Sequence, residues 1–170
     1  SSVEDAESGK FSEFFIFPWM NPADIIQPPD WVKKCVWYQI FPSRFAKGEY
    51  KECKKEFLPW AKLGQSVSNH ESYGGNLQGI IDHLDYLKDL GITGIYSTPV
   101  NQSASQHKYD TADYLTIDSD FGTNEIFVKL VKEAHARGIR VMVDGVFNHC
   151  GKEFFAWQDV LKNKEKSKYK

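Results

Sequence analysis

The segment 140–149 reads RVMVDGVFNH and decides the fold of this chain. Its apolar run, Val141 to Val143, is typical of a strand that is covered on both faces of a sheet. Asp144, Asn148 and His149 then supply a carboxylate, an amide and an imidazole within six residues. Polar groups gathered where a parallel strand ends are typical of α/β active sites, so we expect a functional site here.

Two more strands and two helices are predicted around this segment. Residues 36–41 and 93–98 are rich in aromatic and β-branched side chains, which predicts strands. Asn76 and Thr123 can each cap a following helix, and the first helix carries an apolar stripe. The stripe consists of Leu77, Ile80, Ile81, Leu84, Leu87 and Leu90. The strand–helix alternation predicts right-handed crossovers and a parallel sheet.

The connections in this alternation differ in length. Polar loops over about 42–74 and 100–122 follow the first two strands, whereas the helix-to-strand turns at Gly91 and Gly138 are tight. This asymmetry indicates the α/β class and a (β/α)8 TIM barrel, whose sites lie in the loops after the strands. A doubly wound sheet is the alternative. It would more often carry a glycine-rich phosphate turn after its first strand, and the sequence has none there.

Composition excludes several partners. The chain has 21 lysines and arginines against 23 acidic residues, for a net charge of -2, so we expect no nucleic acid or anionic membrane partner. No apolar stretch approaches the roughly 20 residues that span a bilayer. Its cysteines, Cys35, Cys53 and Cys150, have no metal-ligand spacing, and their odd number favours a reducing compartment.

Several motifs together resemble one enzyme family. Residues 144–149 resemble the first conserved region of the α-amylase superfamily of glycoside hydrolases, and residues 91–99 resemble its second-strand motif. The segments that resemble its neopullulanase, cyclomaltodextrinase and maltogenic amylase subgroup are 38–45 (YQIFPSRF), 73–79 (YGGNLQG) and 107–114 (HKYDTADY). The five motifs occur in the family's order, and the resemblance covers about residues 30–170.

The resemblance implies a domain organisation. Residues 1–30, which contain a run of prolines typical of a linker, would be the tail of an N-terminal β-sandwich domain. Residues 31–149 would be the first part of the catalytic barrel, with about three of its strands. Residues 150–170 would begin the domain that is inserted after barrel strand 3. The family also implies a cytoplasmic parent protein that can form a homodimer.

The implied function is that of a retaining α-glycosidase, which acts through two carboxylates on α-1,4 or α-1,6 glucans, cyclodextrins or pullulan. The family's nucleophilic aspartate follows the fourth strand and its general-acid glutamate follows the fifth. We therefore expect both to lie beyond Lys170, and the 170-residue chain to be inactive alone. The alternatives are a non-catalytic scaffold of the same superfamily and a self-contained sugar-binding module.

Four residues match substrate-binding positions of the family. Tyr109 would stack on the sugar ring next to the scissile bond, because an aromatic ring packs well on the apolar C–H face of a sugar. His107 and His149 would hydrogen-bond hydroxyls of that sugar. Asp144 would orient an arginine that precedes the nucleophile. The alternatives are a tyrosine packed inside its loop, two structural histidines and an aspartate that serves only in a turn.

No cofactor is expected. Many members of the subgroup bind calcium in the loop after the first strand, through asparagine and aspartate oxygens. This chain instead has Lys47, Cys53 and Asn76 in that region. Because calcium needs several well-placed oxygen ligands, we predict that this calcium site is absent. Asn148 resembles a calcium ligand of many α-amylases, but here we expect it to have a structural role.

Overall fold

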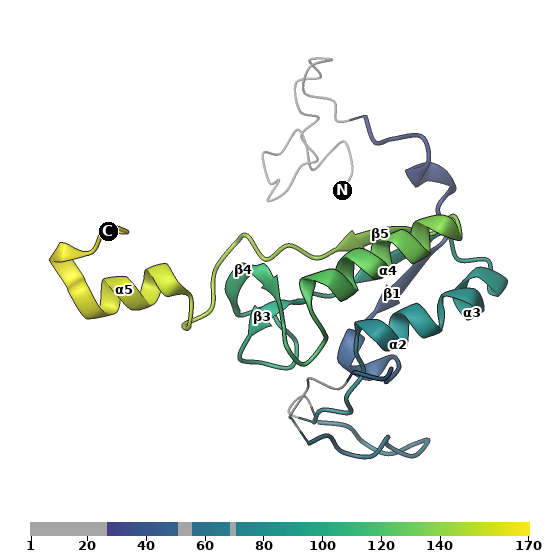
Figure 1. Cartoon of the computed structure of the whole chain (residues 1–170), viewed down its shortest axis with the longest axis horizontal. Helices are drawn as coiled ribbons and strands as arrows, with labels where there is room; N and C mark the ends of the chain where they lie inside the picture. Colours follow the sequence, from purple (N-terminus) through teal and green to yellow (C-terminus); the bar gives the residue numbers. More distant parts are fainter. Residues whose placement is uncertain (1–26, 51–55, 69–70) are drawn as a thin grey trace, which may run out of the picture. The chain divides into compact units, whose positions relative to one another are not determined.

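The computed structural model describes residues 27–50, 56–68 and 71–170 (Figure 1). Contacts divide the chain into two units, residues 1–34 and residues 35–170, and each is described by itself. In the first unit the described part forms one 3-10 turn, η2 (Val32–Lys34). The predicted β-sandwich tail, residues 1–30, lies mostly outside the described residues, so it stays a prediction.

The second unit contains the predicted parallel sheet. Strands β1 (Trp37–Ile40), β2 (Gly94–Ser97) and β5 (Arg140–Val143) lie in the order β1-β2-β5. All pairs are parallel, with Ile40 opposite Ser97 and Ser97 opposite Val143. The three strands therefore end at one edge of the sheet. The loops that follow them start side by side there.

Helices follow each of the first two strands in the chain, and these helices cover one face of the sheet (Figure 1). They are α2 (Leu77–Asp82), α3 (Leu84–Asp89) and α4 (Asn124–Ala136). The predicted caps are confirmed, because Asn76 accepts from the Gly79 N–H and Thr123 accepts from the Ile126 N–H. Helix α2 packs against α4, and α4 packs against β5.

The first predicted helix is interrupted at His83. The His83 N–H bonds the Ile80 carbonyl three residues back, while the imidazole Nδ1 lies 2.8 Å from the Gly79 oxygen. The ring therefore donates to the carbonyl that the His83 N–H would bond in an unbroken helix. The apolar stripe nevertheless continues across the break, because Leu84 and Leu87 are fully buried.

The core lies between the helices and one face of the sheet. Its fully buried members include Ile40, Leu77, Ile80, Leu84, Leu87, Ile95, Leu130 and Ile139. The expectation that the third strand is covered on both faces is wrong for the described residues. Met142 is 46% exposed, and the exposed and half-buried positions of β5 alternate. The face of β5 that carries Met142 has no covering layer among the described residues, whereas Val141 and Val143 pack against the core.

The second polar loop contains a hairpin that the sequence reading missed. Strands β3 (Asn101–Ser103) and β4 (Thr111–Ile117) pair antiparallel, with Ser103 opposite Thr111. The register shifts twice along this short ladder. Residues 104–110, which include His107 and Tyr109, form the loop between the two strands.

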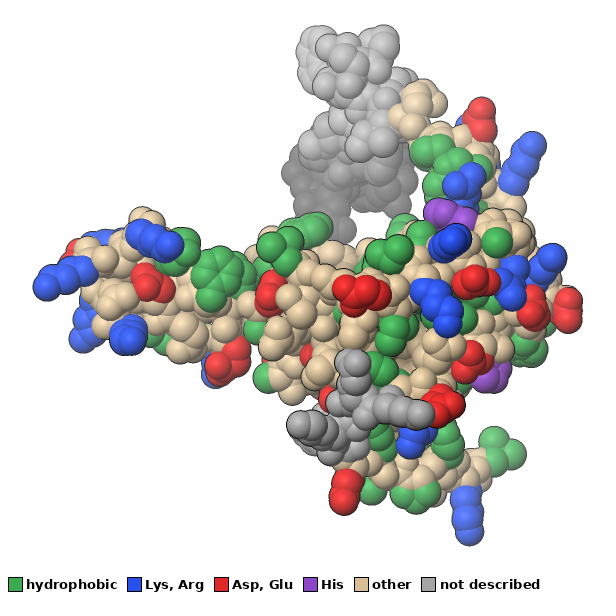
Figure 2. Space-filling model, in the orientation of Figure 1, with side chains coloured by type: hydrophobic (Ala, Val, Ile, Leu, Met, Phe, Trp, Pro, Cys, Tyr) green, Lys and Arg blue, Asp and Glu red, His purple; other side chains and the backbone are tan. Residues whose placement is uncertain are grey.

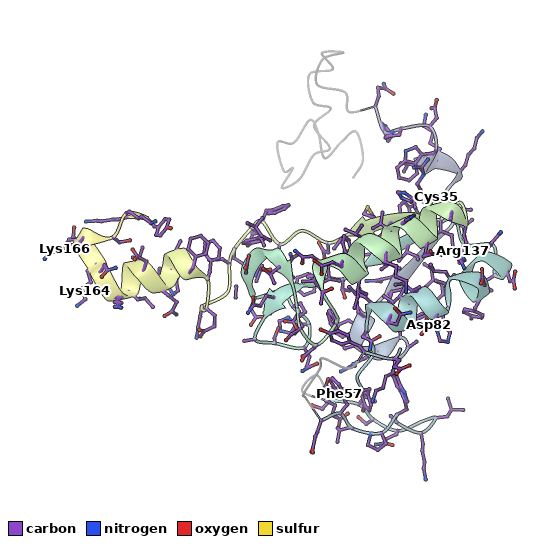
Figure 3. The ribbon with its side chains drawn as sticks, viewed as in Figure 1. Cys35, Phe57, Asp82, Arg137, Lys164 and Lys166 are labelled. Atoms are coloured by element: carbon purple, nitrogen blue, oxygen red, sulfur yellow. The ribbon has the colours of Figure 1, made fainter. Side chains whose placement is uncertain are left out.

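The C-terminal segment forms α5 (Phe155–Asn163) and the turn η4 (Lys164–Lys166), neither of which has a buried residue. Figure 3 labels Lys164 and Lys166 at this end. Basic and acidic side chains are interspersed over the face drawn in Figure 2. Within the described residues, no helix has the length and apolar character required to cross a membrane.

Candidate sugar-binding site

The site is built around Asp144, the first residue after β5. Its N–H donates to the Ser97 carbonyl at 2.9 Å, which carries the strand pairing one residue beyond β5. Its Oδ2 accepts hydrogen bonds from two phenol hydroxyls, that of Tyr96 at 2.8 Å and that of Tyr109 at 2.7 Å. Tyr96 comes from β2 and Tyr109 comes from the hairpin loop. One carboxylate oxygen thus joins three segments of the chain.

The carboxylate changes the acidity of both phenols. Its hydrogen bond raises the pKa of Tyr109 well above the ordinary tyrosine value, and burial raises it further. The same hydrogen bond raises the pKa of Tyr96, again with a smaller contribution from burial. Both shifts share their largest cause, the hydrogen bond to Asp144, and ionising either phenol would also place a second negative charge beside that carboxylate.

His149 joins this network from the other side. Its Nε2 lies 2.9 Å from the Tyr109 carbonyl oxygen and donates to it. The Asn148 amide NH2 donates to the His149 Nδ1, with a nitrogen–nitrogen distance of 3.4 Å. The hydroxyl of Tyr114 on β4 lies 2.9 Å from the His149 carbonyl and 2.6 Å from the Val146 carbonyl. The segment after β5 is thereby fixed onto the hairpin.

His107 lies at the tip of the hairpin loop and is exposed. The Tyr109 N–H donates to its Nδ1 at 3.1 Å, so the ring is a neutral tautomer with its proton on Nε2. The rings of His107 and Tyr109 are 6.0 Å apart and tilted by 32°. The two side chains therefore present an imidazole and a phenol together from one short loop.

The structure brings all four predicted site residues together. Tyr109 contacts Asp144, His149 and His107 directly. Sequence reasoning missed Tyr96, although its place in the second-strand motif, one residue before the end of β2 at Ser97, could have indicated it. It also missed Lys108, whose side chain is only 2% exposed.

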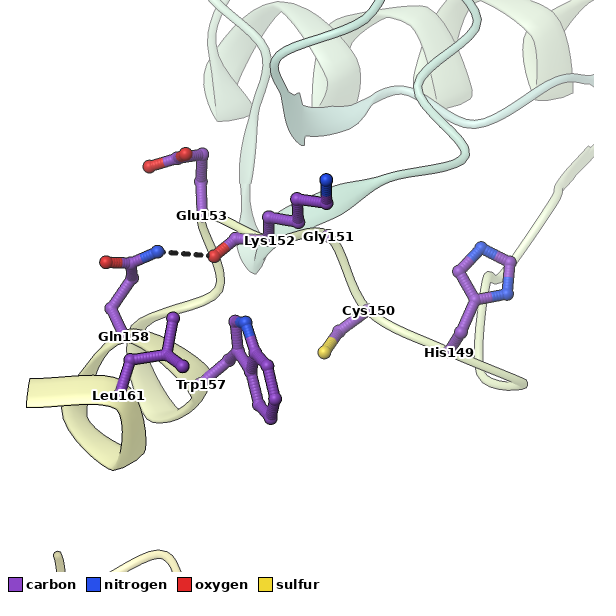
Figure 4. Close-up of a pocket in the computed structure, with 8 residues that line it drawn as sticks. All are labelled: His149, Cys150, Gly151, Lys152, Glu153, Trp157, Gln158 and Leu161. Carbon is purple, nitrogen blue, oxygen red and sulfur yellow. Dashed lines mark hydrogen bonds between the residues drawn. The ribbon is translucent and has the colours of Figure 1, made fainter. Parts of the chain in front are cut away.

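A cavity of about 710 Å³ adjoins this network (Figure 4). Its lining residues are His149, Cys150, Gly151, Lys152, Glu153, Trp157, Gln158 and Leu161. Of the four predicted residues only His149 lines it. Two of the lining residues are hydrogen-bonded to each other, since the Gln158 amide donates to the Lys152 carbonyl at 2.6 Å (Figure 4). The cavity is thus formed mainly by the segment that follows the network, not by the network itself.

The loop after β1, where we predict that no calcium site exists, is held by hydrogen bonds of one side-chain amide. Asn76 Oδ1 accepts from the N–H groups of Gly79 at 2.8 Å and Gly48 at 3.0 Å, while its Nδ2 donates to the Gly48 carbonyl at 3.0 Å. The Lys47 ammonium lies 5.7 Å from the centre of the Phe57 ring. Cys53 lies outside the described residues. The described contacts of the Asn76 amide are thus hydrogen bonds to backbone groups of this loop and of the start of α2.

The chain is similar in sequence to known proteins of one enzyme family. The family described as alpha amylase, catalytic domain, matches residues 39–170. A cyclomaltodextrinase of Geobacillus thermopakistaniensis strain MAS1 is 54% identical over 166 residues, which are 98% of this chain and 28% of that protein. An intracellular maltogenic amylase of Bacillus subtilis is 52% identical over 157 residues, which are 92% of this chain and 26% of that protein.

A solved structure agrees with these matches. The cyclic alpha-maltosyl-(1→6)-maltose hydrolase from Arthrobacter globiformis, in complex with that sugar, is similar with a TM-score of 0.78 at 42% identity. The similarity covers 85% of this chain and 32% of that structure. This chain therefore spans about a quarter to a third of the length of the relatives it matches.

Proposed function

Because the chain belongs to the alpha-amylase catalytic-domain family, we propose that it forms the sugar-holding part of a retaining α-glycosidase. The observation that carries the proposal is the contact of Tyr109 with Asp144, His149 and His107, the four residues that the family resemblance singled out. The substrate class would be α-1,4 or α-1,6 glucans, cyclodextrins or pullulan. The relative named cyclomaltodextrinase supports the cyclodextrin part of this assignment.

Tyr109 is the residue on which binding would depend most. Its hydroxyl is held by Asp144 and its backbone by both histidines, so the ring is fixed before a sugar arrives. A rigid aromatic platform binds a sugar face with little loss of side-chain entropy. His107 would add a hydrogen bond to a hydroxyl, through the Nε2–H that its tautomer provides.

The role of His149 in sugar binding is limited by the hydrogen bonds that its ring already makes. Its ring nitrogens already bond the Tyr109 carbonyl and the Asn148 amide. A sugar hydroxyl would have to replace one of these two contacts. Asp144 uses Oδ2 for both phenols, which leaves Oδ1 for the arginine that the resemblance implies. We propose that Asp144 orients its neighbours and does not attack the sugar.

The catalytic nucleophile and general acid are proposed to lie outside this chain. The resemblance places them after the fourth and fifth barrel strands, and the described residues form three parallel strands. We also propose that the chain holds about three strands of a larger barrel and that residues 1–30 are the tail of a β-sandwich domain. The domain boundaries, with residues 31–149 in the barrel and residues 150–170 in the inserted domain, are proposals too. The finding that would overturn the placement is hydrolysis of any α-glucoside by the pure 170-residue chain.

Two experiments test the proposed function. Titration calorimetry of the chain with maltose and with β-cyclodextrin should show binding, and Tyr109→Ala should weaken it by about three- to tenfold. Tyr86→Ala is the matched control, because Tyr86 is 54% exposed on α3 and belongs to no part of the site. Equal affinity of all three proteins would remove Tyr109 from the site.

A chimera separates an enzyme segment from a non-catalytic scaffold. Residues 39–170 of this chain would replace the matching segment of the Geobacillus cyclomaltodextrinase. If the sugar-holding residues here are functional, the chimera should hydrolyse cyclodextrins. A folded chimera without turnover would favour the scaffold or the sugar-binding module.

The remaining assignments follow from the relatives and the loop geometry. We propose a cytoplasmic protein, as the relative named intracellular maltogenic amylase suggests, with no nucleic acid or membrane partner. The homodimer stays a prediction. We also propose that the loop around Asn76 binds no calcium, because Asn76 Oδ1 already accepts two backbone N–H groups and Lys47 brings a positive charge to this loop.

A further inference from the structure

We propose that Lys108 is a positioning residue, whose buried ammonium fixes the loop that presents His107 and Tyr109 to the sugar. The inference rests on the proposed function for its consequence, but its structural part stands separately. Lys108 lies between the two side chains in sequence, and its own side chain turns away from the site into the hairpin.

The backbone at Lys108 is in the left-handed region, with φ of 62°. A residue with a Cβ rarely adopts this conformation, because its Cβ crowds the carbonyl oxygen that follows, so other contacts must hold it there. The Lys108 N–H donates to the Ser105 hydroxyl at 3.1 Å, and the next N–H, of Tyr109, donates to His107. These local bonds are few, and they involve exposed or half-buried groups. The main anchor is the side chain.

The Lys108 ammonium is bound on several sides. It lies 2.8 Å from Asp118 Oδ2 and 3.6 Å from Asp120 Oδ2. It also donates to the Ser103 carbonyl at 3.3 Å and lies 5.3 Å from the centre of the Phe121 ring. Because the side chains of Lys108 and Asp118 are only 2% and 6% exposed, solvent screens their attraction little.

Asp118 is itself fixed to the hairpin. Its Oδ2 accepts from the Ser103 N–H at 3.0 Å and its Oδ1 accepts from the Asp120 N–H at 2.9 Å. Its own N–H donates to the Val100 carbonyl at 2.9 Å. The carboxylate that binds the Lys108 ammonium is therefore hydrogen-bonded to the base of the hairpin, and through it the tip of the loop is connected to that base.

The neighbouring Asp110 supports the same tip. The hydroxyls of Ser103 and Ser105 both donate to its Oδ1. Burial opposes ionisation of Asp110, but these hydrogen bonds lower its pKa below the ordinary value. A charged carboxylate and a charged lysine thus hold successive parts of residues 103–110. With the tip held, His107 is exposed and the Tyr109 hydroxyl reaches Asp144.

The contrasting explanation is that Lys108 only stabilises the hairpin. A structural role predicts a lower melting temperature but unchanged sugar affinity of the folded protein. A positioning role predicts that the Tyr109 contact with Asp144 weakens even while the fold persists. The two are separated by a readout at Tyr109 that needs no sugar.

The experiment uses the 170-residue chain with ¹³C-labelled tyrosine, with the Tyr109 ring signal assigned from Tyr109→Phe. Between about pH 9 and 11 an ordinary phenol ionises and its signal shifts, whereas Tyr109 should not shift. In Lys108→Met the Tyr109 signal should titrate in that range. Lys108→Arg, which keeps the charge, should restore much of the original behaviour. Lys132→Met, at an exposed lysine of α4, is the control.

Sugar binding is the second readout. Lys108→Met should lower the affinity for maltose or β-cyclodextrin by about three- to tenfold, as Tyr109→Ala does, because both remove the same platform. If Lys108→Met does not fold, Asp120→Asn weakens the more distant carboxylate contact and should give a smaller change in the same direction.

The outcomes distinguish this inference from the proposed function. An unchanged Tyr109 titration in folded Lys108→Met overturns the positioning role, whatever the sugar affinity. A restored ordinary titration without any sugar binding by the unaltered chain keeps the positioning role and overturns the proposed function.

Discussion

Single residues in this chain join segments that are far apart in sequence, and Asp144 is the clearest case. One carboxylate oxygen receives a phenol from β2 and another from the hairpin loop. The strand end, its neighbouring strand and the loop are thus connected through a group that also raises the pKa values of both partners. Replacing the carboxylate tests this coupling directly.

Asp144→Asn should lower the pKa values of Tyr96 and Tyr109 toward the ordinary value of about 10. A phenol whose pKa is raised by folding stabilises the folded state fully below that ordinary value. This stabilisation is lost as pH rises through the higher folded pKa. The free energy of unfolding should therefore fall more steeply above about pH 10 in the unaltered chain than in Asp144→Asn. Urea unfolding at a series of pH values measures it, and equal slopes would contradict the coupling.

Gly79 lies inside α2, where alanine is intrinsically favoured by about 0.5–1 kcal/mol. An added Cβ would nevertheless collide with the Ala46 carbonyl and lie 2.8 Å from the Gly48 nitrogen. We expect Gly79→Ala to destabilise the chain by about 1–3 kcal/mol in chemical denaturation, because backbone atoms cannot move aside easily. A stabilised variant would show that the loop after β1 does not approach the helix this closely.

At the scale of elements, the helix pair α2 and α3 derives its stability from the stripe that continues across His83. Leu84 is fully buried, so Leu84→Ala should cost about 2–5 kcal/mol in the free energy of unfolding. Leu90→Ala is the matched control, because Leu90 is 54% exposed and caps the same helix. Surface substitutions of this kind stay within about 0.5 kcal/mol. Similar losses for both leucines would mean that the stripe does not face the core.

How well the elements could be predicted depends on how long their patterns are. The caps at Asn76 and Thr123 and the stripe from Leu77 to Leu87 are strong local signals, and the structure confirms them. The last predicted stripe position, Leu90, is wrong, because its side chain is 54% exposed. The break at His83 was not predictable from periodicity, because a side-chain bond to Gly79 replaces one backbone bond without disturbing the stripe. The hairpin was missed because β3 has three residues and its pairing with β4 shifts register twice.

The site residues also differ in whether a local sequence pattern indicates them. Motif resemblance picked out Tyr109, His107, Asp144 and His149, and the structure connects them. It gave no indication of Lys108, whose role depends on a carboxylate ten residues along the chain, at Asp118. Pairings of this kind depend on the fold of the hairpin, which no local pattern specified.

At the scale of the whole molecule, the loop around Asn76 bears on stability as well as on metal content. Its amide makes three hydrogen bonds that tie Gly48 to the start of α2. We therefore expect the melting temperature to be the same after treatment with a chelator and after addition of millimolar calcium. A calcium-dependent rise in melting temperature, or stoichiometric binding by calorimetry, would contradict the proposed absence of the site. Asn76→Ala should lower the melting temperature in both conditions, since it removes the amide itself.

Cys150 is a labelling site from which the network could be followed by fluorescence spectroscopy. Of the two free cysteines among the described residues, Cys150 is exposed and Cys35 is half-buried. The Cys150 thiol follows His149 directly and lines the same cavity as Trp157 (Figure 4). A small thiol-reactive dye attached there would sit beside an indole that can transfer its excitation energy to it. Movements of the segment after β5 on sugar binding could then be followed as a change in fluorescence, without altering any of the residues proposed to hold the sugar.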